Sequence, residues 1–196
     1  MKAVSSDQTA RHKHFLRLHY REAVRALSLA KKRAEARAVA RRVADLAEFR
    51  RARVIGVFIS LPTEMDTAPL IALARQSGKT VAVPVVFAEG RMRFAVLLLG
   101  SRRLKKNVYG ILEPVRPEWV DSLDLVIVPG AAFTPQGDRL GAGAGYYDRF
   151  LAKRPRPTSL GICFNGQVAV RLPCAEHDRR VDCVVTPDHL YRVRHV

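Results

Sequence analysis

Residues 124–151 have the sequence DLVIVPGAAFTPQGDRLGAGAGYYDRFL, in which a short apolar run leads through a glycine-rich loop into a helix. The run LVIV at 125–128 is typical of a strand that is buried on both faces. A helix is predicted over residues 146–153, which precede a proline. A buried strand followed by a helix is the repeating unit of α/β proteins.

Other compact apolar runs predict further buried strands. These are residues 54–60 (VIGVFIS), 79–86 (KTVAVPVV), 159–164 (SLGICF) and 181–186 (VDCVVT). Residues 91–99 predict a peripheral antiparallel strand, and residues 67–76 a helix that ends at Gly78. The alternation predicts an α/β fold, a three-layer α/β/α sandwich around a mostly parallel sheet, in which ligands favour the carboxyl ends of the strands.

The first sixty residues are predicted to be helical, over 13–29 and 34–49, because apolar residues recur there at helical spacing. On the first helix, basic residues recur every four positions, at Lys13, Arg17, Arg21 and Arg25. Such a row is either a solvated face or the place where an anion relieves the repulsion. Residues 1–12 are expected to be flexible, and residues 1–196 to form one domain.

The composition indicates which partners and which cellular compartment suit this chain. Thirty-four basic and 18 acidic residues give a net charge of +16, which attracts nucleic acid, nucleotide phosphates or polycarboxylates. Apolar runs are too short to cross a membrane, so no membrane partner is expected. Three cysteines are too few for a disulfide framework and indicate the cytoplasm.

Glycines alternate with alanines over residues 141–145, which leaves backbone N–H groups open to an anion. Arg139 can add a full charge beside them. The spacing matches neither common phosphate-binding fingerprint, so a flexible surface turn is the alternative. Asp148, just behind the loop, can share Mg²⁺ with a phosphate or can simply favour the first helical turn.

Further acidic residues occur near strand ends. Asp182 begins an apolar strand and is therefore either exposed or engaged by a cation. Glu64 lies on a strand-end loop, where binding groups concentrate, whereas Asp66 is expected to cap the next helix. The spacing of Cys174, His177 and Cys183 matches no common zinc module.

In several motifs the sequence resembles the 5-formyltetrahydrofolate cyclo-ligase (5,10-methenyltetrahydrofolate synthetase) family, over about residues 13–186. The motifs occur in order with compatible gaps. They are K-x-x-x-R (Lys13, Arg17), S-x-P-x-E-x-D-T (60–67), Y-G-I-L-E-P (109–114), DLVIVPG-x-AF (124–133), G-x-R-L-G-x-G-x-GYYDR (137–149), Q-V (167–168), L-P (172–173) and HD-x-x-VD (177–182).

The resemblance implies a Mg²⁺- and ATP-dependent ring closure of 5-formyltetrahydrofolate to 5,10-methenyltetrahydrofolate, with release of ADP and phosphate. The formyl oxygen would attack the γ-phosphate, and N10 of the folate would then close on the activated carbon. The protein has mainly to hold two substrates in line and stabilise charge on the transferring phosphoryl group. A monomer is expected, with ATP and a folate that can be polyglutamylated as its ligands.

The resemblance also implies site residues. Those for ATP are Lys13, Arg17, Arg139, Leu140, Gly141, Ala142, Gly143, Ala144, Gly145, Tyr146 and Tyr147. Those for folate are Ile59, Glu64, Ala142, Gly143, Ala144, Gly145 and Tyr146, with Glu64 bonded to the pterin. Those for Mg²⁺ are Asp148 and Asp182.

The chain departs from the family at Ala142 and Ala144, where some members carry basic or bulkier residues. Charge for the phosphates must then come from elsewhere, such as Arg139 or Arg149. Two alternatives remain, a basic nucleic-acid-binding protein and a relative with the same fold that acts on another substrate. The first lacks the aromatic residues interleaved with basic ones that RNA recognition uses.

Overall fold

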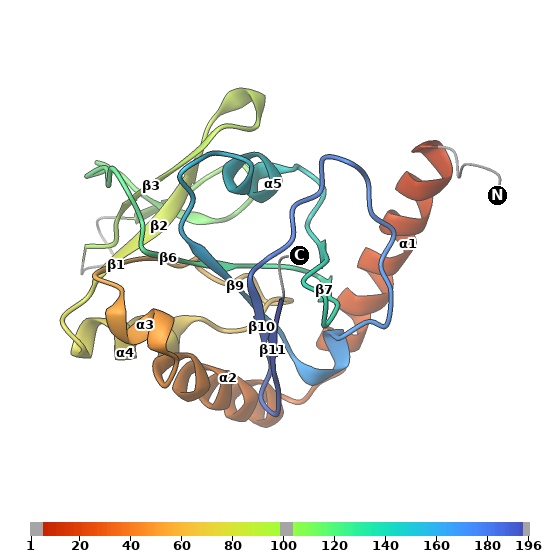
Figure 1. The fold of residues 1–196 in the computed structure, drawn as a ribbon, viewed down its shortest axis with the longest axis horizontal. Coiled ribbons are helices and arrows are strands. Elements are labelled where there is room, and N and C mark those ends of the chain that lie inside the picture. Colours follow the sequence, from red (N-terminus) through yellow and green to blue (C-terminus); the bar gives the residue numbers. More distant parts are fainter. Residues whose placement is uncertain (1–5, 99–103, 194–196) are drawn as a thin grey trace.

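A seven-stranded sheet forms the centre of the molecule in the computed structural model, which describes residues 6–98 and 104–193 (Figure 1). Its strands are β1 (Val54–Gly56), β2 (Thr80–Val86), β3 (Met92–Val96), β6 (Leu125–Val128), β9 (Thr158–Ile162), β10 (Cys183–Val185) and β11 (Leu190–Arg192). Their order is β11-β10-β9-β6-β1-β2-β3. The five inner strands are parallel, and the edge strands β3 and β11 are antiparallel. The mostly parallel sheet and the peripheral antiparallel strand are therefore confirmed.

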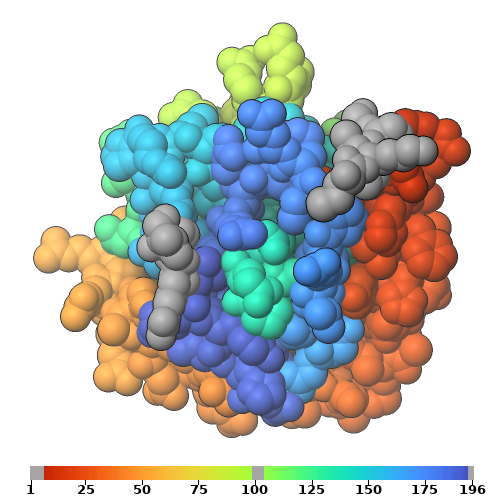
Figure 2. Space-filling view, turned by 45° about the vertical axis from the view of Figure 1, so that its right-hand side comes forward, coloured from red at the N-terminus to blue at the C-terminus, as the bar shows by residue number. Residues whose placement is uncertain are grey.

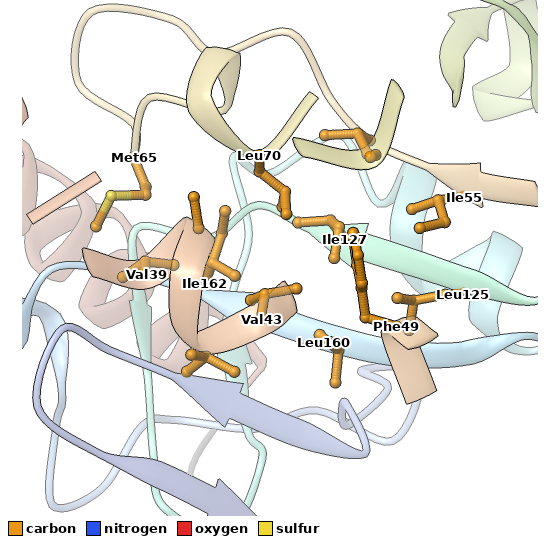
Figure 3. Close-up of a cluster of buried hydrophobic side chains, with 14 of the residues drawn as sticks. Val39, Val43, Phe49, Ile55, Met65, Leu70, Leu125, Ile127, Leu160 and Ile162 are labelled. Carbon is orange, nitrogen blue, oxygen red and sulfur yellow. The ribbon is translucent and has the colours of Figure 1, made fainter. Parts of the chain in front are cut away.

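Three helices cover one face of the sheet: α2 (Leu29–Ala44), α3 (Ala47–Arg51) and α4 (Ala68–Gln76). Figure 3 shows Val39, Val43, Phe49 and Leu70 of these helices directed at the strand side chains Ile55, Leu125, Ile127, Leu160 and Ile162. The central strand β6 is apolar and buried at every position, because the opposite face of the sheet is covered too, by α5 (Tyr146–Leu151) and the loops around it. The three-layer sandwich is confirmed.

The long helix α1 (Ser6–Arg25) lies beside the sandwich, and Figure 2 shows it packed along the blue segment that contains residues 165–180. It contacts η3 (Asn165–Gln167), which follows the carboxyl end of β9. One side of α1 thus faces the end of the sheet where ligands of α/β proteins bind.

The N-terminal helices have different limits from those predicted. The break falls at Ser28, whose side-chain oxygen accepts a hydrogen bond from Lys31 N at 3.2 Å and so caps α2. Of residues 1–12, which were expected to be flexible, residues 6–12 belong to α1 and residues 1–5 lie outside the described part.

Two small hairpins complete the carboxyl end of the sheet. β4 (Leu104–Lys106) pairs with β5 (Leu112–Pro114), and β7 (Ala132–Phe133) pairs with β8 (Arg139–Leu140). A short turn, η1 (Ala88–Gly90), joins β2 to β3. None of the helices in the described ranges is long and apolar enough to cross a lipid bilayer.

Candidate active site

Two cavities lie at the carboxyl end of the sheet, on either side of the loop 141–145. The first, of about 560 Å³, lies between α1, this loop and residues 174–178. The second, of about 370 Å³, lies between the strand-end loops, the loop 141–145 and the β4–β5 hairpin. Both are lined by Arg139, Gly141, Gly145 and Asp148, which therefore form a shared wall.

The first cavity is cationic because the basic row of α1 turns toward it. Lys13 and Arg17 line it, and Arg21 reaches the second cavity one turn further along. Arg17 Nε donates to the Gly141 carbonyl at 2.8 Å, which fixes the helix against the loop. Burial lowers the pKa of Arg17, and the neighbouring charge of Arg21 adds to that effect. Arg25 instead pairs with Glu22 on the surface. The first three residues of the row therefore line the cavities, and the fourth faces solvent.

Lys13 is held by Asp178, a residue to which no role was given on sequence grounds. Burial alone would raise the pKa of Asp178, but hydrogen bonds from Lys13 and the Ala175 N–H outweigh it, so the pKa is lowered. The Asp178 carboxylate is thus an anion at neutral pH that orients Lys13 at the wall of the first cavity.

The loop between the cavities offers unused donors. Within the part of the chain that the structure describes, the backbone N–H groups of residues 142–145 donate to no protein acceptor. Gly143 and Gly145 have φ angles of 113° and 70°, which L side chains rarely adopt. A chain of free N–H groups in such a conformation is suited to a phosphate.

The shared wall contains a buried ion pair. Arg139, with 3% of its side chain exposed, donates from Nη2 to Asp148 Oδ1 at 2.8 Å. The same oxygen accepts from the Arg179 N–H at 3.1 Å, whereas Asp148 Oδ2 has no protein donor among the described residues. One carboxylate oxygen is therefore left for a ligand.

Asp182 does not share this site. Its two carboxylate oxygens accept from the guanidinium of Arg156 at 2.6 and 2.7 Å, and Oδ2 also accepts from the Ser159 N–H at 2.8 Å. It lines neither cavity. Asp182 was expected to hold Mg²⁺ together with Asp148, but both of its carboxylate oxygens are bonded to Arg156 and it lies outside both cavities, so we do not propose it as a ligand. In the described ranges, no three His, Cys, Asp or Glu residues are grouped so as to hold a metal.

The second cavity is mainly apolar and contains Ile59 and Glu64, the residues predicted for folate. Glu64 Oε2 accepts from the Leu61 N–H at 2.8 Å. Burial raises the pKa of the Glu64 carboxyl, and this hydrogen bond opposes the rise only in part. Glu64 is thus a carboxyl in a mainly apolar part of the wall, apart from the Asp148 carboxyl in the wall shared with the first cavity.

The aromatic residues after the loop also lie in the second cavity. Ala142, Ala144, Tyr146 and Tyr147 line it and not the first cavity, whereas Leu140 and Gly143 line the first. Burial raises the pKa of the Tyr147 hydroxyl, and the nearby charge of Glu64 raises it further.

The tip of the β4–β5 hairpin closes the second cavity from the side. Tyr109 and Ile111 line it, and the Tyr109 hydroxyl lies 3.2 Å from that of Tyr146. In the sequence, Tyr109 belongs to the Y-G-I-L-E-P motif (109–114), which by itself predicts no role for it. The motif was the available signal, but nothing in its spacing indicates which cavity the hairpin reaches.

Arg149 connects the loop 141–145 to the turn η1. Its guanidinium donates to the Gly90 carbonyl at 2.9 Å and to the Ala144 carbonyl, and it lies 5.7 Å from the centre of the Tyr146 ring. It therefore stabilises the loop and does not line either cavity.

Comparisons with known proteins agree on one family. The family model described as the 5-formyltetrahydrofolate cyclo-ligase family matches residues 9–187. The 5-formyltetrahydrofolate cyclo-ligase of Escherichia coli K12 is 35% identical over 150 residues, which are 71% of this chain and 81% of that protein. The protein of the same name from mouse is 28% identical over 190 residues, 90% of this chain and 94% of its own length.

Solved structures give the same result for the fold. An NMR structure of Aquifex aeolicus 5,10-methenyltetrahydrofolate synthetase has a TM-score of 0.81, 31% identity and 94% coverage of both chains. The Mycoplasma pneumoniae 5,10-methenyltetrahydrofolate synthetase, at 20% identity, has a TM-score of 0.68 and covers 89% of this chain and 98% of its own. At that identity it supports the fold alone.

Proposed function

The chain belongs to the 5-formyltetrahydrofolate cyclo-ligase family, and we propose that it converts 5-formyltetrahydrofolate and ATP into 5,10-methenyltetrahydrofolate, ADP and phosphate. The observation that carries this proposal is the pair of cavities on one loop. A cationic cavity and an apolar cavity share Arg139, Gly141, Gly145 and Asp148. A reaction between a polyphosphate and a reduced pterin needs such a pair of adjoining sites.

The first cavity is the proposed ATP site. Lys13 and Arg17 supply positive charge from α1, and the free N–H groups of Gly143 and Gly145, which line this cavity, can donate to phosphate oxygens. The absence of basic residues at positions 142 and 144 is balanced in this proposal by Arg139 in the shared wall. Arg149 does not take that role because its guanidinium is bonded to Gly90 and Ala144.

The second cavity is the proposed folate site. Its apolar wall suits the flat pterin ring, and the carboxyl of Glu64 can accept from pterin N–H groups. Ile59 and Tyr146 would contact the ring system from the strand-end loop and from the start of α5. Arg21, which lines the same cavity, is a cation suited to the acidic part of folate.

The proposed reaction has two steps. The formyl oxygen attacks the γ-phosphorus, a P–O bond to ADP breaks, and the carbon becomes an activated iminium phosphate. N10 then attacks this carbon, loses its proton, and the C–O bond breaks to release phosphate and leave the methenyl cation. Because the formyl group must meet the γ-phosphate, the reacting atoms would lie at the shared wall, where Arg139 can stabilise the negative charge.

Mg²⁺ is proposed to arrive with ATP and to be held by Asp148. The free Asp148 Oδ2 fits a divalent cation that takes one protein carboxylate and several phosphate oxygens. The ion would neutralise charge on the phosphates.

The proposed function also carries expectations for the domain organisation, the oligomeric state and the cellular compartment. We expect a single domain over residues 1–196 and a monomer that works in the cytoplasm. The three cysteines are all free thiols, as is usual in a reducing compartment. Nucleic acid is not proposed as the main partner, because the basic row of α1 lies at the two cavities.

The decisive experiment is an assay of the purified protein with MgATP and 5-formyltetrahydrofolate. We expect growth of the methenyl absorbance in the near ultraviolet, dependent on both substrates. Arg17→Ala should raise the KM for ATP about tenfold, which corresponds to one lost charge-assisted hydrogen bond, with a smaller effect on the KM for folate. No absorbance growth with intact, folded protein would overturn the proposed function.

A further inference from the structure

The hydroxyl of Tyr147 is a buried polar group that the fold itself does not use. Its Oη atom is shielded from solvent, and no hydrogen-bond partner lies near it in the described part of the chain. Buried hydroxyl groups in native proteins nearly always have a partner, because an unpaired one destabilises the folded state. A phenylalanine would fill the same space without this penalty, so the hydroxyl needs an explanation.

The surroundings of Tyr147 show what kind of partner is missing. The residue lines the apolar second cavity, and the guanidinium carbon of Arg139 lies 5.8 Å from the centre of its ring. That cation faces the ring and leaves the hydroxyl unpaired. The ring of Tyr147 lines the cavity, whereas its hydroxyl oxygen is closed to solvent, so a ligand that fills the cavity reaches this oxygen when the side chain shifts on binding.

Glu64 is the complementary group in the same cavity. Its carboxyl accepts one hydrogen bond, from the Leu61 N–H, and is held in a fixed place on the strand-end loop by that bond. A carboxylate accepts hydrogen bonds and a phenol can donate one. Together they offer an acceptor and a donor in a mainly apolar wall that also contains the charged groups of Arg21, Arg139 and Asp148. An acceptor beside a donor suits a heterocycle carrying N–H groups next to a carbonyl or ring nitrogen.

We propose that the Tyr147 hydroxyl is a specificity-determining donor to an acceptor atom on the pterin ring of the folate, acting alongside the Glu64 carboxyl. This inference rests on the proposed function. It moves Tyr147 from the ATP site, where the resemblance put it, to the folate site. A donor that is unpaired until the ligand enters gains its full hydrogen bond only on binding, so it rejects rings that lack the matching acceptor.

The test is Tyr147→Phe, which removes one oxygen atom and keeps the ring that Arg139 contacts. We expect the Kd for 5-formyltetrahydrofolate, measured by calorimetry without nucleotide, and its KM to rise about tenfold, as for one lost hydrogen bond. The Kd for a non-hydrolysable ATP analogue with Mg²⁺ should stay within about twofold of the wild-type value. The melting temperature of the ligand-free protein should be unchanged or higher, because an unpaired buried hydroxyl has been removed.

Tyr191→Phe on the edge strand β11 is the matched control and should leave both affinities unchanged. A Tyr147→Phe protein with wild-type folate affinity would overturn the inference. A lower melting temperature with equal losses for both ligands would overturn it too, since that result indicates a structural hydrogen bond, for example to a buried water. Wild-type protein that binds no folate would instead refute the proposed function, so the two failures are distinguishable.

Discussion

The ion pair of Arg139 and Asp148 lies where the two cavities meet, and its burial makes it sensitive to the loss of either charge. Asp148→Asn leaves the guanidinium, which is 3% exposed, without a counter-charge. We expect the free energy of unfolding in urea to fall by about 3 kcal/mol. Activity should also fall, and added Mg²⁺ should restore part of it if Asp148 holds the ion.

Asp121→Asn is the control for this experiment, since that carboxyl is exposed and remote from the cavities. Its stability should stay within about 0.5 kcal/mol of the wild-type value. Unchanged Mg²⁺ dependence in Asp148→Asn would remove this carboxylate from the proposed metal site.

The stability of the protein should depend on pH through Glu64. Burial raises the pKa of the Glu64 carboxyl above the ordinary value of 4.5. Between 4.5 and the raised pKa, the folded protein binds more protons at this group than the unfolded chain does. Stability from this group is therefore lost as the pH rises through that window. Compared with Glu64→Gln, the wild-type protein should become relatively less stable between pH 4.5 and pH 7.5.

Urea unfolding of both proteins at the two pH values measures this difference, and the other carboxyls cancel because both proteins contain them. A gap between the two proteins that stays constant with pH would contradict the burial argument. Glu64→Gln should also weaken folate binding, so the more stable protein at neutral pH should be the less active one.

Pairs of charges that are distant in sequence could not be predicted from it. Asp182 was expected to be either exposed or engaged by a cation, and Arg156, 26 positions away, is that cation. Lys13 and Asp178 are separated by 165 positions. Spacing arguments work within one helix or strand, and neither pair lies within one.

The loop 141–145 is the element whose backbone conformation matters most for binding. Gly143→Ala places a side chain at φ 113°, although nothing lies within 3.5 Å of the added carbon. We expect the loop to change conformation and the KM for ATP to rise at least about tenfold. Stability should fall by only about 1–2 kcal/mol, because the loop is exposed.

Gly78→Ala provides the same kind of backbone strain away from the site, at φ 69° after the end of α4. It should lose about 1 kcal/mol of stability and keep wild-type kinetics. Similar kinetic losses in both variants would show that strain anywhere in the fold, and not the loop itself, is responsible.

Helices and strands could be predicted from the sequence where neighbouring residues alone determine them. The strand over 125–128 matches β6, because four buried apolar residues are bounded by turn-forming ones. The run 54–60 predicted a longer strand than β1, since Val57 and Phe58 are buried and Ile59 lines the second cavity beyond the end of the strand. Apolar character reports burial, and it does not distinguish a sheet from the wall of a cavity.

The net charge of +16 belongs to the molecule as a whole and attracts polyanions of any sequence. We expect RNA to be retained on filters at about 50 mM salt and to be largely released at about 200 mM, while the cyclisation assay still proceeds. Retention that survives about 200 mM salt, and that competes with ATP, would favour the nucleic-acid alternative.

The layered architecture was predictable because several buried strands alternate with helices, and five of them are indeed parallel neighbours. The position of α1 relative to the sheet was not predictable from the sequence. Its sequence predicts an amphipathic basic helix, but only packing against residues beyond 140 brings Lys13 and Arg17 to the cavity at the end of the sheet. The site is formed from segments whose proximity depends on the entire chain.

The wall shared by the two cavities has a thermodynamic consequence. If a ligand in one cavity shifts any of the four shared residues, a ligand in the other cavity meets an altered wall. Linkage then requires that each ligand change the affinity for the other by the same factor, whichever arrives first. Binding of one substrate would in this way change the affinity of the other cavity for its own substrate, through Arg139 and Asp148.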